Sequence, residues 1–332
     1  MKIIVDAMGG DYAPQAVVEG AVEAVREIDL EVVLVGQEKK IKSLLNNFSY
    51  PKERVSVYPA EETIEMAENP ALSVRKKKNS SIVIGLELLA QNYGDAFFSA
   101  GNTGAVVCAS SLILGLLEGI ERPGISLIIP TLKGKSLIID VGANIDPKPI
   151  HLLQYAIMGT SYFEAVLHKD NPKIGLLNIG EEETKGTEFM RQTHQLISES
   201  PLKDNFLGNI DGKDLFSGKC DIIICDGFVG NVALKVSESM LEFIFYLLRD
   251  SLKYNPIGIL GFNLMKLGLG QLRKKIDYTE YGGAPLLGVN GIVIIGHGRS
   301  NPHAIKNGIK VAKESAEMQI NSKILNVLKS NS

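Results

Sequence analysis

Uninterrupted runs of apolar residues recur along the chain, and most of them are separated by segments long enough to form a helix. The runs lie at 2–5, 31–35, 55–58, 96–99, 125–130, 136–140, 173–179, 221–225 and 292–295. Continuous apolar strands interleaved with helices are typical of a mostly parallel sheet covered by helices on both faces. We therefore predict a three-layer α/β fold with a doubly wound sheet. Only TLKGK joins the runs at 125–130 and 136–140, so these two should form a hairpin, which makes the sheet mixed.

The segments between the runs predict the helices and the domain organisation. Helix-length segments lie at 14–27, 80–92, 103–117, 149–168, 182–198, 230–250 and 302–328. The chain has no internal repeat and no linker rich in Pro, Gly or Ser, so we expect residues 1–332 to form a single α/β domain. The segment 256–276, PIGILGFNLMKLGLGQLRKKI, is apolar on all sides and does not fit a helix that covers a sheet. We expect the region around 240–280 to protrude and to contact a second copy of the chain, a membrane, or both.

Charge, apolar length and cysteine usage exclude several classes of protein. The formal net charge of -3 gives no electrostatic reason to bind nucleic acid. The longest apolar stretch, 105–117, is interrupted by Ser110 and Ser111 and is too short to span a bilayer. The three cysteines form no CxxC pair, and reduced thiols are usual in the cytoplasm. We therefore predict a cytoplasmic protein that at most lies on the surface of a membrane.

Glycine-rich stretches fall at the ends of the predicted strands. They read DAMGGD (6–11), SAGNTGA (99–105), DVGAN (140–144), NIGEE (178–182), DGFVGN (226–231) and GHG (296–298). In an open α/β sheet, ligands bind outside the carboxyl ends of the strands, where free N–H groups and helix N-termini favour an anion. One helix end contributes only about 0.3–1 kcal/mol toward an exposed anion. We therefore expect several of these loops to act together on a phosphate group.

The standard fingerprints of nucleotide, metal and nucleophile sites are missing. No GxGxxG follows a predicted strand, and neither a P-loop, HExxH nor GxSxG occurs. In the first loop, Asp6 and Asp11 bracket Gly9 and Gly10, and we interpret this loop as part of a phosphate pocket rather than a metal site. The carboxylates in these loops can equally cap helices or hold neighbouring loops. We predict neither a metal nor a cofactor.

Taken together, the motifs resemble those of the bacterial phosphate acyltransferases of phospholipid synthesis. In chain order they are DAMGGD, SAGNTGA, ERPG (121–124), DVGAN with QYAIMG (154–159), NIGEE with KG (185–186), DGFVGN and YGGAPLLG (281–288). The resemblance runs from residue 1 to about residue 300. One departure is Tyr12, where the family often has His, so we assign no proton transfer to that position.

The resemblance implies an activity, a fold and partners. The activity is transfer of a long-chain fatty acyl group from the thioester of acyl carrier protein to inorganic phosphate, which gives acyl phosphate without a cofactor. The fold is similar to that of the isocitrate/isopropylmalate dehydrogenase and phosphotransacetylase group. The family forms homodimers and associates peripherally with the membrane, where a membrane glycerol-phosphate acyltransferase is a candidate partner.

Attack of phosphate on a thioester needs a held phosphate and donors aimed at the oxygen that becomes negative. The catalytic candidates are Asn102, Thr103, Asp226, Asn231, Lys185 and His297. The substrate-binding candidates are Asp6, Gly9, Gly10, Asp11, Gly101, Gly104, Asn144, Gly180, Gly227 and Gly230. We expect residues 102–104, with Gly227 and Asn231, to cradle the phosphate and the oxyanion. Lys185 is the candidate cation, and His297 either donates to the leaving thiolate or is a buried, hydrogen-bonded histidine.

Two further surfaces carry predictions. The basic run of Arg75, Lys76, Lys77 and Lys78 would attract an acidic acyl carrier protein, although such a run is usually only a solvated face. In the segment 256–276, the residues predicted to contact an anionic membrane are Ile259, Phe262, Leu267, Lys266, Arg273, Lys274 and Lys275.

Three other interpretations stay open at the level of sequence. A phosphotransacetylase-like enzyme would use acyl-coenzyme A as the donor. A metal- and nicotinamide-dependent dehydrogenase of the same fold group would depend on a metal. A non-catalytic, membrane-associated scaffold would bind acidic proteins through the basic clusters, but six glycine loops at strand ends are hard to reconcile with a scaffold.

Overall fold

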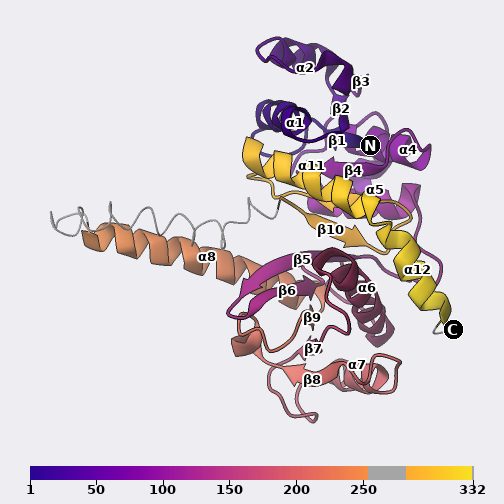
Figure 1. Ribbon diagram of the computed structural model, residues 1–332, viewed down its shortest axis with the longest axis vertical. Coiled ribbons are helices and arrows are strands. Elements are labelled where there is room, and N and C mark those ends of the chain that lie inside the picture. The colour runs from indigo at the N-terminus through magenta and orange to yellow at the C-terminus, as the bar shows by residue number, and fades with distance from the viewer. Residues whose placement is uncertain (253–281, 331–332) are drawn as a thin grey trace.

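An eleven-stranded sheet forms the centre of the protein in the computed structural model, which describes residues 1–252 and 282–330 (Figure 1). Its strands are β1 (Lys2–Asp6), β2 (Glu31–Gly36), β3 (Val55–Pro59), β4 (Ala96–Ser99), β5 (Gly124–Thr131), β6 (Gly134–Ile139), β7 (Ile174–Leu177), β8 (Phe206–Ile210), β9 (Ile222–Ile224), β10 (Ala284–Leu287) and β11 (Val293–Ile295). All nine predicted runs are strands. The strands β8 and β10 were not predicted.

Two groups of parallel strands run in opposite directions within this sheet. The strand order is β3-β2-β1-β4-β11-β10-β5-β6-β9-β7-β8. Strands β1 to β4 and β11 are mutually parallel, and so are β6 to β9. The pairs β11–β10, β10–β5 and β5–β6 between the groups are antiparallel, and this odd number of reversals turns the second group against the first. The β5–β6 pair, with Ile128 opposite Leu137, confirms the predicted hairpin.

Helices lie on both faces of the sheet. They are α1 (Gln15–Glu27), α2 (Glu38–Leu45), α3 (Pro70–Lys76), α4 (Ser81–Ala90), α5 (Thr103–Ile113), α6 (Pro149–Leu167), α7 (Glu188–Ser198), α8 (Gly227–Leu252), α11 (Pro302–Glu317) and α12 (Ile320–Ser330). The helix predicted over 302–328 is two helices, separated by Gln319 with a φ of 52°. The helix predicted from residue 182 begins at Glu188, because the Thr187 side chain caps it by accepting from the Met190 N–H.

Alternate strand residues face opposite helical layers. In β1, Ile3 and Val5 belong to the core that α1 and α11 cover, whereas Ile4 belongs to the core beneath α4 and α5. In β9, Ile224 packs in the core with α6 and α12, and Ile223 faces the other layer. The structure therefore confirms the three-layer α/β fold with a mixed, mostly parallel sheet.

Helix α8 leaves the body of the protein. Figure 1 shows it as a long orange helix that extends away from the sheet. Most of the region predicted to protrude, around 240–280, lies outside the described residues. Its apolar side chains are exposed, and Phe243 and Tyr246 are 54% and 64% accessible. Within the described parts of the chain, no helix is both long and apolar enough to cross a membrane.

Candidate active site

The first loop cluster is built around Asp6, the last residue of β1. Asp6 is fully buried, and its carboxylate accepts from the Met8 N–H at 3.0 Å and from the Ser99 hydroxyl at 2.7 Å. Ser99 ends β4, and its Oγ accepts from the Gly101 N–H at 3.0 Å. Burial raises the pKa of Asp6, although the hydrogen bonds oppose this shift. Asp6 therefore ties the loop after β1 to the loop after β4.

These loops approach so closely that only glycine fits at their contact. A Cβ at Gly9 would lie 2.7 Å from the Gly101 nitrogen, and one at Gly101 would lie 3.2 Å from the Gly9 Cα. Gly10 has a φ of +106°, which favours glycine, and the exposed Asp11 donates its N–H to the Gly298 carbonyl at 2.8 Å. The loops after β1, β4 and β11 therefore meet at one edge of the sheet.

The side chain of Asn102 is fully engaged inside the protein. Asn102 is 6% exposed, and its Oδ1 caps α5 by accepting from the Ala105 N–H at 3.0 Å. Its Nδ2 donates to the carbonyls of Glu65, Met66 and Glu68 at 3.1 to 3.2 Å. In this arrangement Asn102 holds residues 65–68 against the start of α5, and its amide is not free to act as the oxyanion donor suggested by the sequence.

The neighbours of Asn102 in the predicted cradle begin α5. Thr103, its first residue, is half-buried. Gly104 lies against α3, because a Cβ there would come within 2.6 Å of the Pro70 Cγ. The backbone N–H groups of this first turn, rather than the Asn102 side chain, are what this part of the cradle can present to an anion.

A second buried carboxylate, Asp140, organises the loop that follows β6. Its oxygens accept from the backbone N–H groups of Ile125, Gly142, Ala143 and Asn144 at distances from 2.7 to 3.1 Å. Burial raises the pKa of Asp140 against these hydrogen bonds. Asp140 thus ties the loop after β6 to the start of β5, as Asp6 ties the loops after β1 and β4.

Asn144 joins three of the sequence motifs in this second cluster. Its Nδ2 donates to the Pro123 carbonyl at 2.6 Å and to the Tyr155 hydroxyl at 2.7 Å. Its carbonyl accepts from the Gly227 N–H at 2.8 Å. Asn144 therefore holds ERPG, DVGAN and DGFVGN together through its side chain and its backbone carbonyl. This gives Asn144 a structural role.

The first turn of α8 packs directly on this loop. Asp226 caps the helix, since its Oδ1 accepts from the Val229 N–H at 2.8 Å. A Cβ at Gly227 would lie 2.6 Å from the Asn144 carbonyl oxygen, and a Cβ at Gly230 would lie only 1.9 Å from the Asp140 carbonyl oxygen. Asn231 comes next and is exposed, which leaves its amide accessible to a ligand.

The loop between β7 and α7 carries Gly180 and Lys185 and is tied to the body from the inside. The Asn178 side chain donates to the Lys185 carbonyl at 3.2 Å, and Asn209 of β8 donates to the Glu182 carbonyl at 2.9 Å. A Cβ at Gly180 would meet the Lys185 Cγ at 3.1 Å, so these two residues are in contact. Lys185 itself is exposed.

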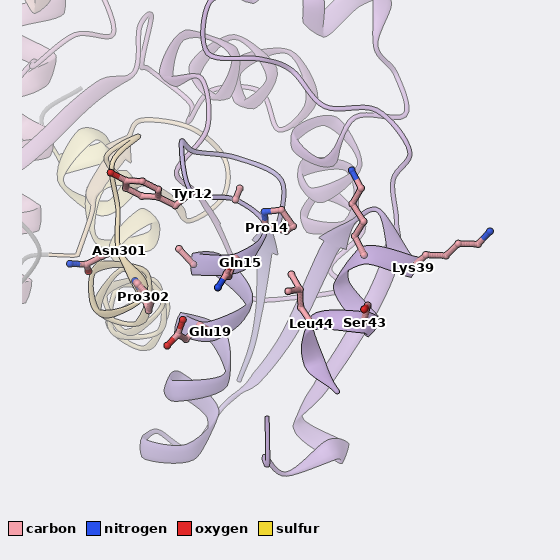
Figure 2. A pocket seen from close by; sticks show the side chains of 12 residues that line it. Tyr12, Pro14, Gln15, Glu19, Lys39, Ser43, Leu44, Asn301 and Pro302 are labelled. Atoms are coloured by element: carbon pink, nitrogen blue, oxygen red, sulfur yellow. The ribbon is translucent and has the colours of Figure 1, made fainter. Parts of the chain in front are cut away.

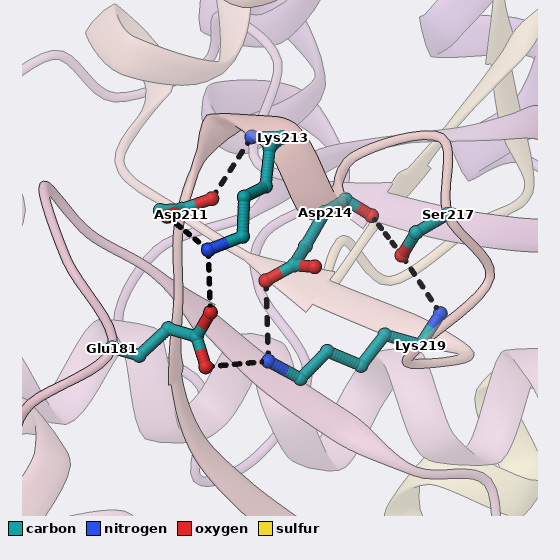
Figure 3. A network of polar contacts seen from close by, with 6 residues as sticks. All are labelled: Glu181, Asp211, Lys213, Asp214, Ser217 and Lys219. Carbon is teal, nitrogen blue, oxygen red and sulfur yellow. Dashed lines mark hydrogen bonds and ion pairs between the residues drawn. The ribbon is translucent and has the colours of Figure 1, made fainter.

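The same loop is held from the outside by ion pairs (Figure 3). Glu181 lies between Lys213 and Lys219, with Nζ–O distances of 2.7 and 2.9 Å. Asp211 and Asp214 pair with the same two lysines. Lys213, followed by Lys219, lowers the pKa of Glu181 to about 2. The predicted cation Lys185 therefore belongs to a loop of fixed position.

The six glycine loops form two groups rather than one. Strands β6, β7 and β9 run against β1, β4 and β11, so their loops leave the sheet at the opposite edge. Of the catalytic candidates, Asn102, Thr103 and His297 lie in the first group, and Asp226, Asn231 and Lys185 in the second. Helix α8 links the groups, because it begins in the second and its Lys235 Nζ lies 3.3 Å from the His297 Nε2 in the first.

A hollow of about 830 Å³ lies beside the first loop (Figure 2). Figure 2 shows Tyr12 and Asn301 on one side of it and Lys39 and Leu44 of α2 on the other. Neither Asp6 nor the glycines that contact it line this space. The hollow therefore lies outside the contact between the loops after β1 and β4.

The basic run is only partly available as a surface. Lys77 forms an ion pair with Glu68 and donates to the Thr63 carbonyl, so it holds residues 63–68. Arg75, Lys76 and Lys78 are exposed. All residues predicted to contact a membrane, Ile259, Phe262, Lys266, Leu267, Arg273, Lys274 and Lys275, lie outside the described residues.

Asp140 holds neighbouring loops, which is the role that the sequence analysis offers for carboxylates in these loops. Two other residues that shape these clusters were not predicted. Ser99 stands at a strand end inside a quoted motif, so its position in the sequence could have suggested a role in holding the loops. Lys235 had no such signal, because its contact with His297 depends on the direction in which α8 leaves the sheet. Among residues 1–252 and 282–330, no group of three or more His, Cys, Asp and Glu side chains is arranged to hold a metal ion.

The sheet and its loops define a fold shared with known enzymes. A phosphotransacetylase from Streptococcus pyogenes has a TM-score of 0.66 and 17% identity, over 96% of this chain and 94% of its own. A 4-hydroxythreonine-4-phosphate dehydrogenase from Klebsiella pneumoniae has a TM-score of 0.51 and 13% identity, over 95% and 99%. The protein is thus an α/β protein of the fold group that contains phosphotransacetylases and this dehydrogenase.

Sequence similarity narrows this class to one family. Residues 1–323 match the model of a family described as fatty acid synthesis protein. The phosphate acyltransferase of Dictyoglomus turgidum is 50% identical over 326 residues, 98% of this chain and 97% of the relative. That of Desulfitobacterium hafniense is 50% identical over 318 residues, 96% and 94%. The chain belongs to the family of bacterial phosphate acyltransferases, as its motifs predict, and it is an acyltransferase.

Proposed function

We propose that this acyltransferase moves a long-chain fatty acyl group from acyl carrier protein to inorganic phosphate, for membrane phospholipid synthesis. An oxygen of hydrogen phosphate bonds to the thioester carbon, and the carbon–sulfur bond breaks with its electron pair on sulfur. The proton of hydrogen phosphate ends on that sulfur, so the products are acyl phosphate and a free thiol. The observation that supports this most directly is the 50% identity to a phosphate acyltransferase over 98% of the chain.

The loops offer what this reaction needs without an enzyme nucleophile. Helices α5, α8 and α11 each begin in a loop that follows a strand, and their first N–H groups favour a phosphate. Lys185 supplies an exposed positive charge on a fixed loop, and Asn231 an accessible amide. Holding phosphate against the thioester carbonyl can contribute up to about 7–11 kcal/mol through proximity.

His297 is placed to handle the proton. Burial, followed by the charge of Lys235, lowers its pKa, so the imidazole is neutral at neutral pH. The backbone N–H of Arg299 donates to the His297 Nδ1, so the proton of the neutral ring is on Nε2. In this proposal the Nε2 proton passes to the leaving thiolate, and in the same step the ring takes up the proton of hydrogen phosphate.

The exposed Arg75, Lys76 and Lys78 are proposed to receive the acidic acyl carrier protein. Charges on a rim mainly steer association, so their effect should weaken with salt. Lys77 is excluded from this surface by its ion pair with Glu68. We also propose a homodimer formed through α8, with peripheral membrane contact through residues 256–276.

Thiol release tests the proposed function. Purified protein is mixed with palmitoyl-acyl carrier protein or palmitoyl-coenzyme A, with and without phosphate, and the thiol and the hydroxylamine-reactive acyl phosphate are titrated. We expect phosphate-dependent release from the carrier protein. Replacing Arg75 and Lys76 with Glu should slow that release at low salt and leave release from any small thioester unchanged. Release from coenzyme A alone would favour a phosphotransacetylase-like enzyme, and no release from either donor would refute the proposal.

A further inference from the structure

Three large apolar side chains are exposed at the edge of the sheet where the second loop group lies. Ile145, Ile179 and Phe228 are 74%, 81% and 62% exposed. Ile145 and Ile179 belong to the loops after β6 and β7, and Phe228 belongs to the first turn of α8, which follows β9. The strands β6, β9 and β7 are neighbours in the sheet. These three side chains form an exposed apolar patch, and such a patch is typical of a surface that binds another molecule.

A backbone hydrogen bond holds two members of the apolar patch beside each other. The Gly227 N–H donates to the Asn144 carbonyl at 2.8 Å. Phe228 and Ile145 are the next residues after these two partners, so both side chains are carried on backbone that is fixed at one point. Gly227 also packs tightly on the Asn144 backbone, which leaves no space for a Cβ between the two segments.

The third member of the apolar patch shares its loop with a positive charge. Strands β7 and β9 pair with Leu176 opposite Ile224, so the loops that follow them start side by side. The Ile179 N–H donates to the Asn178 Oδ1 at 2.8 Å, and the Asn178 Nδ2 donates to the Lys185 carbonyl at 3.2 Å. One fixed loop therefore presents the apolar side chain of Ile179 and the exposed ammonium group of Lys185.

An amide lies at the border of the patch on the side of α8. Asn231 is three residues after Phe228 on this helix, and residues at this spacing are neighbours on the helix surface. The exposed Asn231 side chain rests on the loop after β6, because a Cβ at Gly142 would lie 3.7 Å from the Asn231 Cγ. An apolar surface bordered by a cation and an amide is complementary to a molecule with one apolar tail and an anionic head.

The first loop group differs in this respect. The structure describes the loops after β1, β4 and β11 in full, at 7–14, 100–102 and 296–301, and Tyr12 is the only large apolar side chain exposed in them. Tyr12 lines the hollow beside α2. An alkyl chain therefore finds its apolar surface in the second group and not in the first.

We infer that Ile145, Ile179 and Phe228 bind the alkyl chain of the acyl phosphate. Lys185 and Asn231 bind its phosphate head. The inference rests on the proposed function and deepens it, because it assigns the acyl group to the second loop group. Each methylene that leaves water for the patch favours binding, and the ammonium group favours a negative head over a positive one. Binding is reversible, and no bond forms between the protein and the ligand.

Titration calorimetry with unreactive ligands of the same chemistry measures this binding without an acyl donor. Octyl, decyl and dodecyl phosphate, each below its critical micelle concentration, are titrated into the full-length protein. We expect the affinity to rise with chain length by up to about 4-fold for each added carbon, the gain for a methylene that leaves water. Dodecyltrimethylammonium has the same tail as dodecyl phosphate and a positive head, so it should bind at least about 10-fold more weakly.

Matched variants assign the tail and the head separately. Phe228→Ser and Ile179→Ser should each weaken the binding of dodecyl phosphate by about 10-fold and reduce the dependence on chain length. Lys185→Met should weaken all three alkyl phosphates by a similar factor and leave the dependence on chain length unchanged. Leu132→Ser is the control, because Leu132 is 89% exposed but lies in the turn between β5 and β6, at the opposite edge of the sheet. It should bind as the wild type does, and thermal unfolding of each variant shows whether it is folded.

The outcomes separate this inference from the proposed function. Equal affinity for octyl and dodecyl phosphate would refute the subsite, and so would wild-type affinity in both Phe228→Ser and Ile179→Ser. A dimeric wild type with monomeric Phe228→Ser and Ile179→Ser variants would also refute it, because a second copy of the chain would then cover the patch. Binding that depends on chain length, without any acyl transfer, would keep the subsite and refute the function. Phosphate-dependent transfer from palmitoyl-acyl carrier protein that neither serine variant affects would refute the subsite and keep the function.

Discussion

At the scale of single residues, the two loop groups depend on carboxylates that the protein buries at a cost. Asp6 and Asp140 each stand at the end of a strand and hold neighbouring loops through hydrogen bonds. Burial raises the pKa of both carboxyl groups. A raised pKa means that the folded state holds its proton at pH values where the unfolded chain has lost it. Stability from such a group is present at low pH and falls as the pH rises from about 3.9, the ordinary aspartate value, through the pKa of the folded state.

Asp6→Asn tests this at one site. The amide oxygen can still accept from the Met8 N–H, and its NH₂ can donate to the Ser99 hydroxyl. Because Asn carries no charge, the variant should gain stability relative to the wild type as the pH rises, by about 1.4 kcal/mol for each unit by which the pKa is raised. Urea unfolding between pH 4 and pH 8 measures this difference. Asp11→Asn, in the same loop but exposed, should follow the wild type, and an equal pH dependence for Asp6→Asn and wild type would contradict the argument.

At the scale of elements, the loop between β7 and α7 is held by contacts at both its faces. The backbone ties from Asn178 and Asn209 are inside, and the Glu181 ion pairs with Lys213 and Lys219 are outside. Exposed pairs contribute little to global stability, so their effect should be local. These ion pairs set the position of Lys185, and therefore the position of its positive charge in the second loop group.

Glu181→Gln should therefore loosen the loop without unfolding the protein. We expect several-fold faster amide hydrogen exchange over residues 178–187, with little change in the melting temperature. The pKa of Glu181 is lowered to about 2, so in the wild type the protection is present above about pH 4.5 and is lost as the pH falls toward 2. Glu188→Gln, which breaks an equally exposed pair with Arg191 on α7, is the control. Unchanged exchange in Glu181→Gln would assign the position of the loop to Asn178 and Asn209 alone.

At the scale of the whole molecule, the sequence predicts the layers well and the site incompletely. The predicted strands are apolar throughout, because both of their faces are buried, whereas the missed β8 is an edge strand and the missed β10 contains Pro285. Asn102 was a poor prediction for a donor, since the residue types that cap helices are also those that bind ligands. The Lys235–His297 contact could not be predicted, because it depends on strand directions and on the path of α8. Residue types that can carry out chemistry can be recognised in the sequence. Which of them lie next to each other depends on the topology of the fold.

The longest-range feature is α8, which carries apolar side chains away from the body. Only its first turns pack on the core, whereas Val236, Met240, Phe243 and Tyr246 are 52% to 64% exposed. In the proposed homodimer, a second copy of the chain covers this exposed apolar face by symmetry. In a two-fold interface every substitution counts twice, so Met240→Glu with Phe243→Glu removes four buried side chains, about 6–12 kcal/mol of association.

Sedimentation velocity at micromolar concentration distinguishes the possibilities. The wild type should sediment as a dimer, the Met240→Glu, Phe243→Glu variant as a folded monomer, and Lys310→Glu, a charge change on α11, as a dimer. If the wild type is a monomer, a second copy of the chain does not cover the exposed face of α8. Flotation with vesicles that contain anionic lipid would then test whether this face contacts a membrane. A variant that remains dimeric would exclude α8 from the interface, because no dimer built on that face could tolerate four buried carboxylates.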